Sequence, residues 1–207
     1  MLVERIANSV FTSNTWIIKS DNLVWLVDCG DVEPLLPLIG DRVVKGVLLT
    51  HGHFDHIYGL NDLFERFPEV RVYCSEWARD QLLNAKLNLS FYHETPFEFT
   101  WPDRITVVED GDVVDLGNGN VATAVATPGH TPGCITWMTD DLLFTGDAYI
   151  PDVRVVTNLP HGNRRQAASS VEKILALAAT RTICPGHDVD PSILTTNISL
   201  IKNNSNN

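Results

Sequence analysis

One short run of residues constrains the fold most, because it joins a buried strand to a cluster of metal-binding side chains. The apolar segment Val43–Leu49 predicts a buried strand, and after Thr50 it leads into His-Gly-His-Phe-Asp-His at residues 51–56. Three imidazoles and one carboxylate at this spacing can turn towards one point in the loop that follows the strand. An HxHxDH string is expected by chance about once in a thousand or more such chains. The run therefore predicts a metal site at a strand end.

Three later positions each place a potential ligand directly after a glycine at the end of a predicted strand. They are His130 and His187, each in Pro-Gly-His, and Asp147 in Thr-Gly-Asp. Glycine permits the sharp turn that aims the following side chain, and several strand ends can deliver ligands to one sheet edge. The metal ligands that we predict are His51, His53, Asp55, His56, His130, Asp147 and His187.

The hydrophobic pattern predicts groups of strands, each group followed by helices. The predicted strands are 2–6, 14–19, 23–28, 43–49, 70–74, 105–108, 113–116, 121–126, 135–139, 142–144 and 181–184. The predicted helices are 32–39, 59–67, 76–84, 166–179 and 192–201, and the aromatic stretch 86–103 is predicted to be a loop. This order is typical of two sheets covered by outer helices, an α/β layered sandwich. We expect a single domain over residues 1–202 and a disordered polar tail at 203–207.

Composition narrows the classes of partner and the compartment. A net charge of −11 argues against nucleic acid as the main partner, and no apolar run is long enough to cross a membrane. The cysteines are widely spaced without a CxxC motif, at positions Cys29, Cys74, Cys134 and Cys184. We expect them to be buried reduced thiols. With no secretory signal in the first residues, the reduced thiols predict a cytoplasmic protein. We expect its partner to be a small-molecule substrate, without nucleic acid or membrane.

The motifs together resemble those of the metallo-β-lactamase-fold hydrolases. The matching residues are Asp28 in Val-Asp-Cys-Gly, the HxHxDH run, His130, Asp147 and His187, so the resemblance covers most of the chain. It implies the family's αβ/βα four-layer sandwich and a site for two metals. By this analogy one metal would bind His51, His53 and His130, and the other would bind Asp55, His56 and His187. Asp147 would bridge the two metals, and Asp28 would fix the ligand loop through hydrogen bonds.

Such a ligand set implies hydrolytic chemistry. Two zinc ions would give a metal-bridging hydroxide as nucleophile, and iron or manganese would also suit mixed imidazole and carboxylate ligands. Asp147 and Asp55 are the catalytic candidates. Asp55 has a spare oxygen that could handle a proton, or it could serve as a structural ligand alone.

Within the family, the chain is most similar to the glyoxalase II-like (hydroxyacylglutathione hydrolase-like) group. The similar segments are Thr127–Gly133, Leu143–Asp147 and Asn88-Leu-Ser followed by Pro96-Phe. Differences include Tyr58 in place of a glycine and the lack of a Gly-Arg-x-Asp string after Asp147. The resemblance implies a thioester or ester-like substrate first and a lactone second. The bridging aspartate and the missing export signal argue against antibiotic hydrolysis.

Other interpretations remain open. Sulfur dioxygenases resemble this fold and use a single iron, and a non-catalytic metal-binding module is a third alternative. A short domain with an open mouth is compatible with a homodimer whose second chain completes the pocket. His93, His161 and Tyr149 can contact substrate or merely occupy loops. Arg154, Arg164 and Arg165 can bind a carboxylate or carry surface charge.

Overall fold

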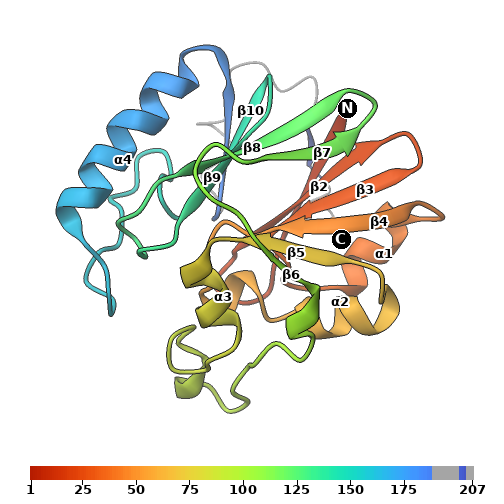
Figure 1. Cartoon of the computed structure of the whole chain (residues 1–207), viewed down its shortest axis with the longest axis horizontal. Helices are drawn as coiled ribbons and strands as arrows, with labels where there is room; N and C mark the ends of the chain where they lie inside the picture. The colour runs from red at the N-terminus through yellow and green to blue at the C-terminus, as the bar shows by residue number, and fades with distance from the viewer. Residues whose placement is uncertain (188–200, 204–207) are drawn as a thin grey trace.

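The computed structural model describes residues 1–187 and 201–203, which form two β-sheets with helices on the outside of each (Figure 1). The seven-stranded sheet has the order β12 (Ile201–Asn203), β1 (Leu2–Ala7), β2 (Asn14–Ser20), β3 (Leu23–Val27), β4 (Val43–Leu48), β5 (Arg71–Cys74) and β6 (Ile105–Val107). The five-stranded sheet has the order β11 (Thr182–Pro185), β10 (Leu142–Gly146), β9 (Ile135–Met138), β8 (Asn120–Ala126) and β7 (Val113–Gly117).

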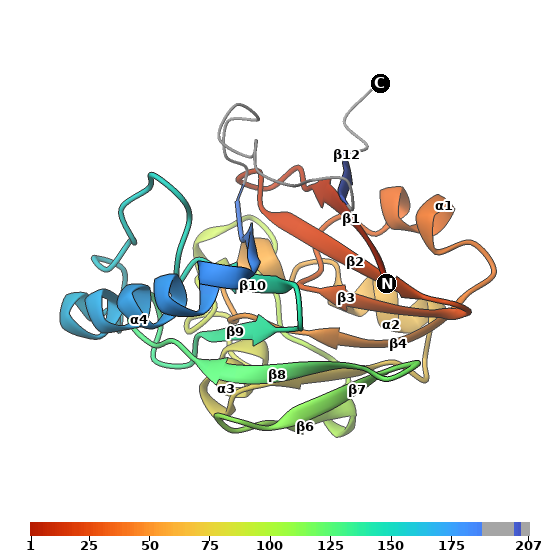
Figure 2. The ribbon, with the colours of Figure 1, turned by 90° about the horizontal axis from the view of Figure 1, so that it is seen from above.

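The helices lie on the outer faces of the two sheets. The α-helices are α1 (Leu36–Ile39), α2 (Leu60–Arg66), α3 (Glu76–Leu82) and α4 (Arg164–Leu177). Short 3₁₀ turns occur at Glu33–Leu35, Phe54–His56, Ser90–Tyr92, Pro102–Arg104 and Ala178–Thr180. Figure 2 shows α4 outside the smaller sheet and α1 on the opposite side of the molecule, beyond the larger sheet.

The alternation of side chains along β3 explains why the larger sheet packs against helices on one face and against the smaller sheet on the other. Successive residues of a strand point to opposite faces, and both faces of this strand are apolar. Val24 and Leu26 pack in the cluster that includes Phe64 of α2, whereas Trp25 and Val27 pack in the cluster between the sheets. A smaller cluster joins Ile174 of α4 to Cys134 and Ala148, which lie beside the ends of β9 and β10 in the smaller sheet. Three apolar interfaces therefore hold four layers together, as the predicted sandwich requires.

The predicted elements agree with the structure, except at the end of the chain. Each strand and helix predicted before residue 188 is present, with its ends shifted by a few residues at most. Of the predicted helix 192–201, residues 192–200 lie outside the described residues. The assignment of Ile201 to a helix is wrong, because Ile201–Asn203 pairs as a parallel strand with β1. Asn203, which we expected to begin the tail, ends that strand, and residues 204–207 lie outside the described part.

The cysteines are free and buried, as the sequence predicted. Burial raises the pKa of the Cys74 thiol to about 12 and that of Cys134 to about 11, so neither thiol ionises near neutral pH. Within the part of the chain that the structure describes, no helix is both long enough and apolar enough to span a bilayer.

We predict that Leu26→Ala lowers the free energy of unfolding by about 2–5 kcal/mol, because it removes a fully buried side chain between the larger sheet and its helices. Leu175→Ala is the control, since this α4 side chain is exposed, and its effect should stay within about 0.5 kcal/mol. Urea unfolding of the metal-loaded protein measures both. Equal effects in the two variants would contradict the assigned core.

Candidate metal centre

Strand direction brings the predicted ligands to one place. β8 and β10 both run antiparallel to β9, and β11 runs parallel to β10, so these three strands end at the same edge of their sheet. His130, Asp147 and His187 follow those ends. The end of β4 joins them across the two sheets, because the Thr50 carbonyl accepts a hydrogen bond from the Ile135 amide. The loop with His51 to His56 therefore faces the ligands of the smaller sheet.

The seven predicted ligand side chains meet in three overlapping groups. Within each group, the ligand atoms lie within 4.8 Å of one another. The groups are His51, His53 and His130; His51, His56 and Asp147; and Asp55, His56 and His187. Asp147 faces both ends of the cluster. Its Oδ2 lies 3.6 Å from His130 Nε2 and 3.4 Å from His187 Nε2. This is the position that a bridging carboxylate needs.

In three of the histidines, a hydrogen bond from Nδ1 to a group outside the cluster leaves Nε2 facing the cluster. His130 Nδ1 donates to the Val156 carbonyl (2.8 Å), and His187 Nδ1 donates to the Phe11 carbonyl (2.9 Å). His56 Nδ1 donates to Asp28 (2.9 Å). In all three residues Nε2 is left to point inward. His53 instead presents Nδ1, which lies 2.9 Å from His130 Nε2.

Asp28 orients the ligand loop, as the resemblance implied. One carboxylate oxygen accepts the Thr50 amide (2.8 Å), and the other accepts both the Thr50 hydroxyl (2.7 Å) and His56 Nδ1. The residue is buried and has a positive φ of 59°. Asp and Asn tolerate this left-handed conformation better than other side chains do. The strand end before Asp28 and the ligand loop are thus held together by one carboxylate.

Two glycines are required by close packing at the centre. Gly146 has φ +50°, and a Cβ there would lie 2.4 Å from the Thr50 hydroxyl oxygen. A Cβ at Gly186 would lie 2.4 Å from Asp147 Oδ1. Any side chain at either position would displace a ligand or its support, which explains the glycine before Asp147 and before His187.

The donor set fits divalent metal ions. Two of its buried atoms, His51 Nε2 and Asp147 Oδ1, have no hydrogen-bond partner among the described residues. Buried polar atoms are normally paired, and unpaired ones that face other ligand atoms are typical of a site that binds an ion. Imidazole nitrogens with carboxylate oxygens suit zinc, and also iron or manganese. Whether each side chain binds a metal stays a prediction.

Electrostatics divides the histidines into two groups. Burial and the imidazoles of His56 and His53 lower the pKa of His51 well below its usual range. Burial and His130 lower the pKa of His53 to about 3. Burial also opposes a charge on His56 and His187, but the carboxylates of Asp55 and Asp147 outweigh it. The pKa of His56 is therefore raised well above its usual range, and that of His187 is raised to about 9.

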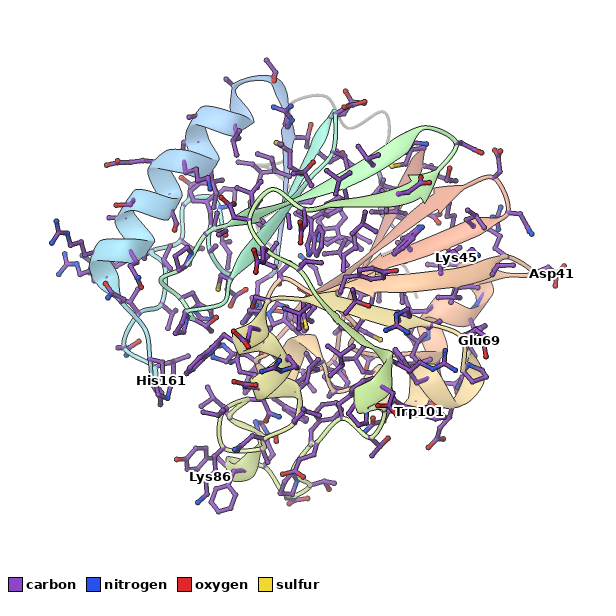
Figure 3. The ribbon with its side chains drawn as sticks, viewed as in Figure 1. Asp41, Lys45, Glu69, Lys86, Trp101 and His161 are labelled. Atoms are coloured by element: carbon purple, nitrogen blue, oxygen red, sulfur yellow. The ribbon has the colours of Figure 1, made fainter. Side chains whose placement is uncertain are left out.

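The loop residues singled out from the sequence lie around the centre rather than among its donors. The His161 ring packs edge-on against Trp77 at 5.0 Å, at the tip of the loop after β10 (Figure 3). The His93 ring lies 4.6 Å from that of Phe54. Tyr149 packs beside Ala148 under α4, and its backbone carbonyl accepts the Thr145 hydroxyl. These contacts support packing roles.

The aromatic stretch mainly packs a loop. Phe97 and Phe99 are buried in the core between the larger sheet and its helices, and Trp101 packs against that core. Phe91 and Tyr92 are exposed. Of the arginines, Arg154, Arg164 and Arg165 are all exposed.

Sequence reasoning missed the groups that support the ligands through the backbone. The carbonyls of Phe11 and Val156 orient His187 and His130, and Ser13 Oγ donates to the Asp55 carbonyl (2.6 Å). A backbone carbonyl has no residue signature, so no sequence motif marks the first two. Ser13 begins a polar run, Ser-Asn-Thr at residues 13–15, whose last two residues open β2. That polar run was the sequence signal from which a supporting role of Ser13 could have been predicted.

We predict that Asp28→Asn weakens metal binding by about 10–100-fold, because the amide cannot replace the carboxylate towards both Thr50 and His56. Asparagine accepts the positive φ, so the backbone should be retained. Competition with a chromogenic chelator measures the affinity, and circular dichroism checks the fold. Affinity equal to that of the unchanged protein would show that Asp28 does not support the ligands.

We also predict that metal uptake by the chelator-treated protein releases protons unevenly. At pH 7 the low pKa of His51 and His53 leaves them neutral, whereas His187, with a pKa of about 9, holds a proton that a metal must displace. An ion bound by the group with His187 should therefore release more protons than an ion bound by the group with His51 and His53, and it should bind more tightly as the pH rises towards 9. Calorimetric zinc titrations in buffers of different ionisation enthalpy measure this. Two metal equivalents that release equal numbers of protons would contradict the assignment.

The chain is similar to known proteins in both sequence and fold. The profile of the metallo-beta-lactamase superfamily matches residues 8–187. The hydroxyacylglutathione hydrolase of Yersinia pestis (strain Pestoides F) is 29% identical over 180 residues, covering 81% of this chain and 62% of the relative. The chain thus spans less than two thirds of that relative's length. This similarity agrees with the resemblance to the glyoxalase II-like group.

Solved structures show the same fold. BLEG-1, a B3 metallo-beta-lactamase, has a TM-score of 0.81 at 24% identity, covering 94% of this chain and 100% of that one. TTHA1623 in a di-iron-bound form has a TM-score of 0.77 at 23% identity, covering 89% and 92%. Since the superfamily profile extends over most of the residues and includes all the predicted ligands, the chain belongs to the metallo-beta-lactamase superfamily.

Proposed function

We propose that the protein is a dinuclear metal-dependent hydrolase of a small thioester or ester-like substrate. The observation that carries this proposal is the position of Asp147 between two groups of donors. One group is His51, His53 and His130, and the other is Asp55, His56 and His187. A carboxylate shared by two ligand groups is the arrangement of a two-metal site.

The chain's own residues would divide the work as follows. His51, His53 and His130 would hold one ion, Asp55, His56 and His187 would hold the other, and Asp147 would bridge them. When bound, two divalent cations lower the pKa of a shared water towards neutrality and polarise a carbonyl oxygen. Asp55 is partly exposed, and its Oδ2 lies 3.3 Å from His187 Nε2; we propose that this carboxylate accepts a proton during hydrolysis.

The substrate class rests on the relatives. The curated relative is named for hydrolysis of hydroxyacylglutathione, a thioester, and the similarity supports a thioester as the first candidate. A lactone is the second candidate for the same site. We further propose zinc as the resident metal, with iron or manganese as alternatives, since one structural neighbour is described in a di-iron-bound form. The free buried thiols suit the cytoplasm as compartment.

A mononuclear iron sulfur dioxygenase is the second candidate function. His51, His56 and Asp147 form a group of two histidines and one carboxylate within 4.8 Å. That ligand set is typical of non-haem iron oxygenases. Metal content separates the candidates: one iron with oxygen uptake on glutathione persulfide favours the dioxygenase, and two ions with thioester hydrolysis favour the hydrolase.

The test is a substrate panel on metal-analysed protein. It includes a glutathione thioester, an acyl-homoserine lactone, a phosphodiester and a β-lactam. We expect thioester hydrolysis, and a loss of at least about 100-fold in kcat for Asp147→Ala, because that change removes the shared ligand. Asp152→Asn is the control, since Asp152 is an exposed acid of the same loop outside the donor set. Full turnover in Asp147→Ala, or no hydrolysis of the whole panel with two ions bound, would contradict the proposal.

A further inference from the structure

The loop between β1 and β2, residues 8–13, contacts two predicted metal ligands but contains none itself. The Phe11 carbonyl accepts the hydrogen bond from His187 Nδ1 (2.9 Å), and Ser13 Oγ donates to the Asp55 carbonyl (2.6 Å). Ser13 also forms an isolated antiparallel bridge with His187. Asp55 and His187 belong to the same group of three candidate ligands. The β1–β2 loop therefore supports two of the three ligands of one ion position.

The first residues of β2 hold the backbone that leads to His187. The Asn14 amide donates to the Gly186 carbonyl (2.7 Å), and Asn14 Nδ2 donates to the Pro185 carbonyl (3.1 Å). Trp16 Nε1 donates to the same Pro185 carbonyl (3.0 Å). The ring of His187 and the two residues before it are thus fixed by one continuous segment, which runs from the β1–β2 loop into β2.

The candidate ligands of the other ion position have supports elsewhere. They are His51, His53 and His130. The Gln81 side chain of α3 accepts the Gly52 amide (3.1 Å), between the first two of them. In the described part of the chain, no hydrogen bond joins any of the three to residues 8–13. The β1–β2 loop is therefore attached to one ion position only.

The β1–β2 loop has a backbone conformation that its residues do not favour. Phe11 and Thr12 have φ values of 51° and 54°, so two consecutive residues other than glycine are left-handed. Branching at Cβ, as in Thr12, makes this conformation especially unfavourable. Strained backbone of this kind persists only where surrounding contacts hold it. The Phe11 carbonyl therefore reaches His187 only while the loop is anchored.

The anchor of the β1–β2 loop is Asp31, which follows β3. Its carboxylate accepts the Ser9 amide (2.7 Å) and the Ser9 hydroxyl (2.9 Å). The Tyr58 hydroxyl donates to the same carboxylate (2.7 Å). Asn8 Oδ1 accepts the Asp31 amide (3.0 Å), and Asn8 Nδ2 donates to Ser13 Oγ (3.1 Å). Among the described residues, the Tyr58 hydroxyl bonds only this anchor and the loop, and none of the seven candidate ligands.

We propose, on the basis of the two-ion centre in the proposed function, that the β1–β2 loop sets the affinity of one ion position alone. That position is the one formed by Asp55, His56 and His187. Tyr58 and Asp31 are positioning residues for its ion, because they hold the loop in its strained form. Without them the loop relaxes, its carbonyl leaves the imidazole, and a ligand that was held in place must be ordered again when the ion binds.

Anomalous diffraction at the zinc edge, from crystals equilibrated at a series of free zinc concentrations, measures the occupancy of each position separately. Tyr58→Phe removes only the hydroxyl. We expect it to weaken zinc binding about tenfold at the position with His187 and to change the other position by no more than about twofold. Tyr73→Phe is the matched control, because Tyr73 is also partly buried and its hydroxyl has no hydrogen bond to a described residue. It should leave both positions unchanged.

Two substitutions of Thr12 test the conformation of the loop without removing its anchor. Proline fixes φ at about −65° and forces the segment out of its left-handed form, whereas asparagine tolerates that form. We expect Thr12→Pro to weaken zinc binding at least about tenfold at the position with His187, and Thr12→Asn to stay within about twofold. Because Thr12 is exposed, both variants should keep the fold, which circular dichroism checks.

The outcomes separate this proposal from the proposed function. If the unchanged protein holds two ions, and Tyr58→Phe and Thr12→Pro weaken both positions alike or neither, only the role of the loop is overturned. If the unchanged protein holds a single ion at saturating zinc, the two-ion centre is overturned and the role of the loop with it.

Discussion

The hydrogen bonds of the Asp28 carboxylate are the interaction on which the candidate centre depends. They join the end of β3 to the start of the ligand loop through Thr50, and they orient His56. A buried carboxylate without partners would be strongly unfavourable, so this arrangement is stable only when the loop adopts its ligand-presenting form. The fold of the larger sheet and the geometry of the centre are therefore coupled through one residue.

The packing of the two sheets against each other also keeps the candidate metal centre rigid. His51 to His56 come from the larger sheet, and His130, Asp147 and His187 come from the smaller sheet, so the donors meet only when the sheets are packed. The interface between the sheets is apolar and includes Trp137 and Phe144, both fully buried. Side chains delivered by packed strand ends lose little conformational freedom on binding an ion. Metal binding and sheet packing should thus stabilise each other.

Much of the fold and of the candidate metal centre could be predicted from the sequence, because the residue patterns that mark strands, turns and ligands are local. Uninterrupted apolar runs marked strands such as β3, and glycines marked the turns before Asp147 and His187. The convergence of the seven donors followed from their places at strand ends. The pairing of Ile201–Asn203 with β1 could not be predicted, because it is a contact between chain segments about 200 residues apart. Nor could the roles of the Phe11 and Val156 carbonyls, since every residue has a carbonyl.

The central claim is that the seven side chains hold two cations bridged by Asp147. Anomalous diffraction from a crystal of the metal-loaded protein, recorded at the absorption edge of the resident metal, tests it most directly. The account predicts two peaks about 3.5–4 Å apart. One should lie among His51, His53 and His130 and the other among Asp55, His56 and His187, with Asp147 between the two. A single peak in a fully loaded crystal, or peaks away from Asp147, would contradict it.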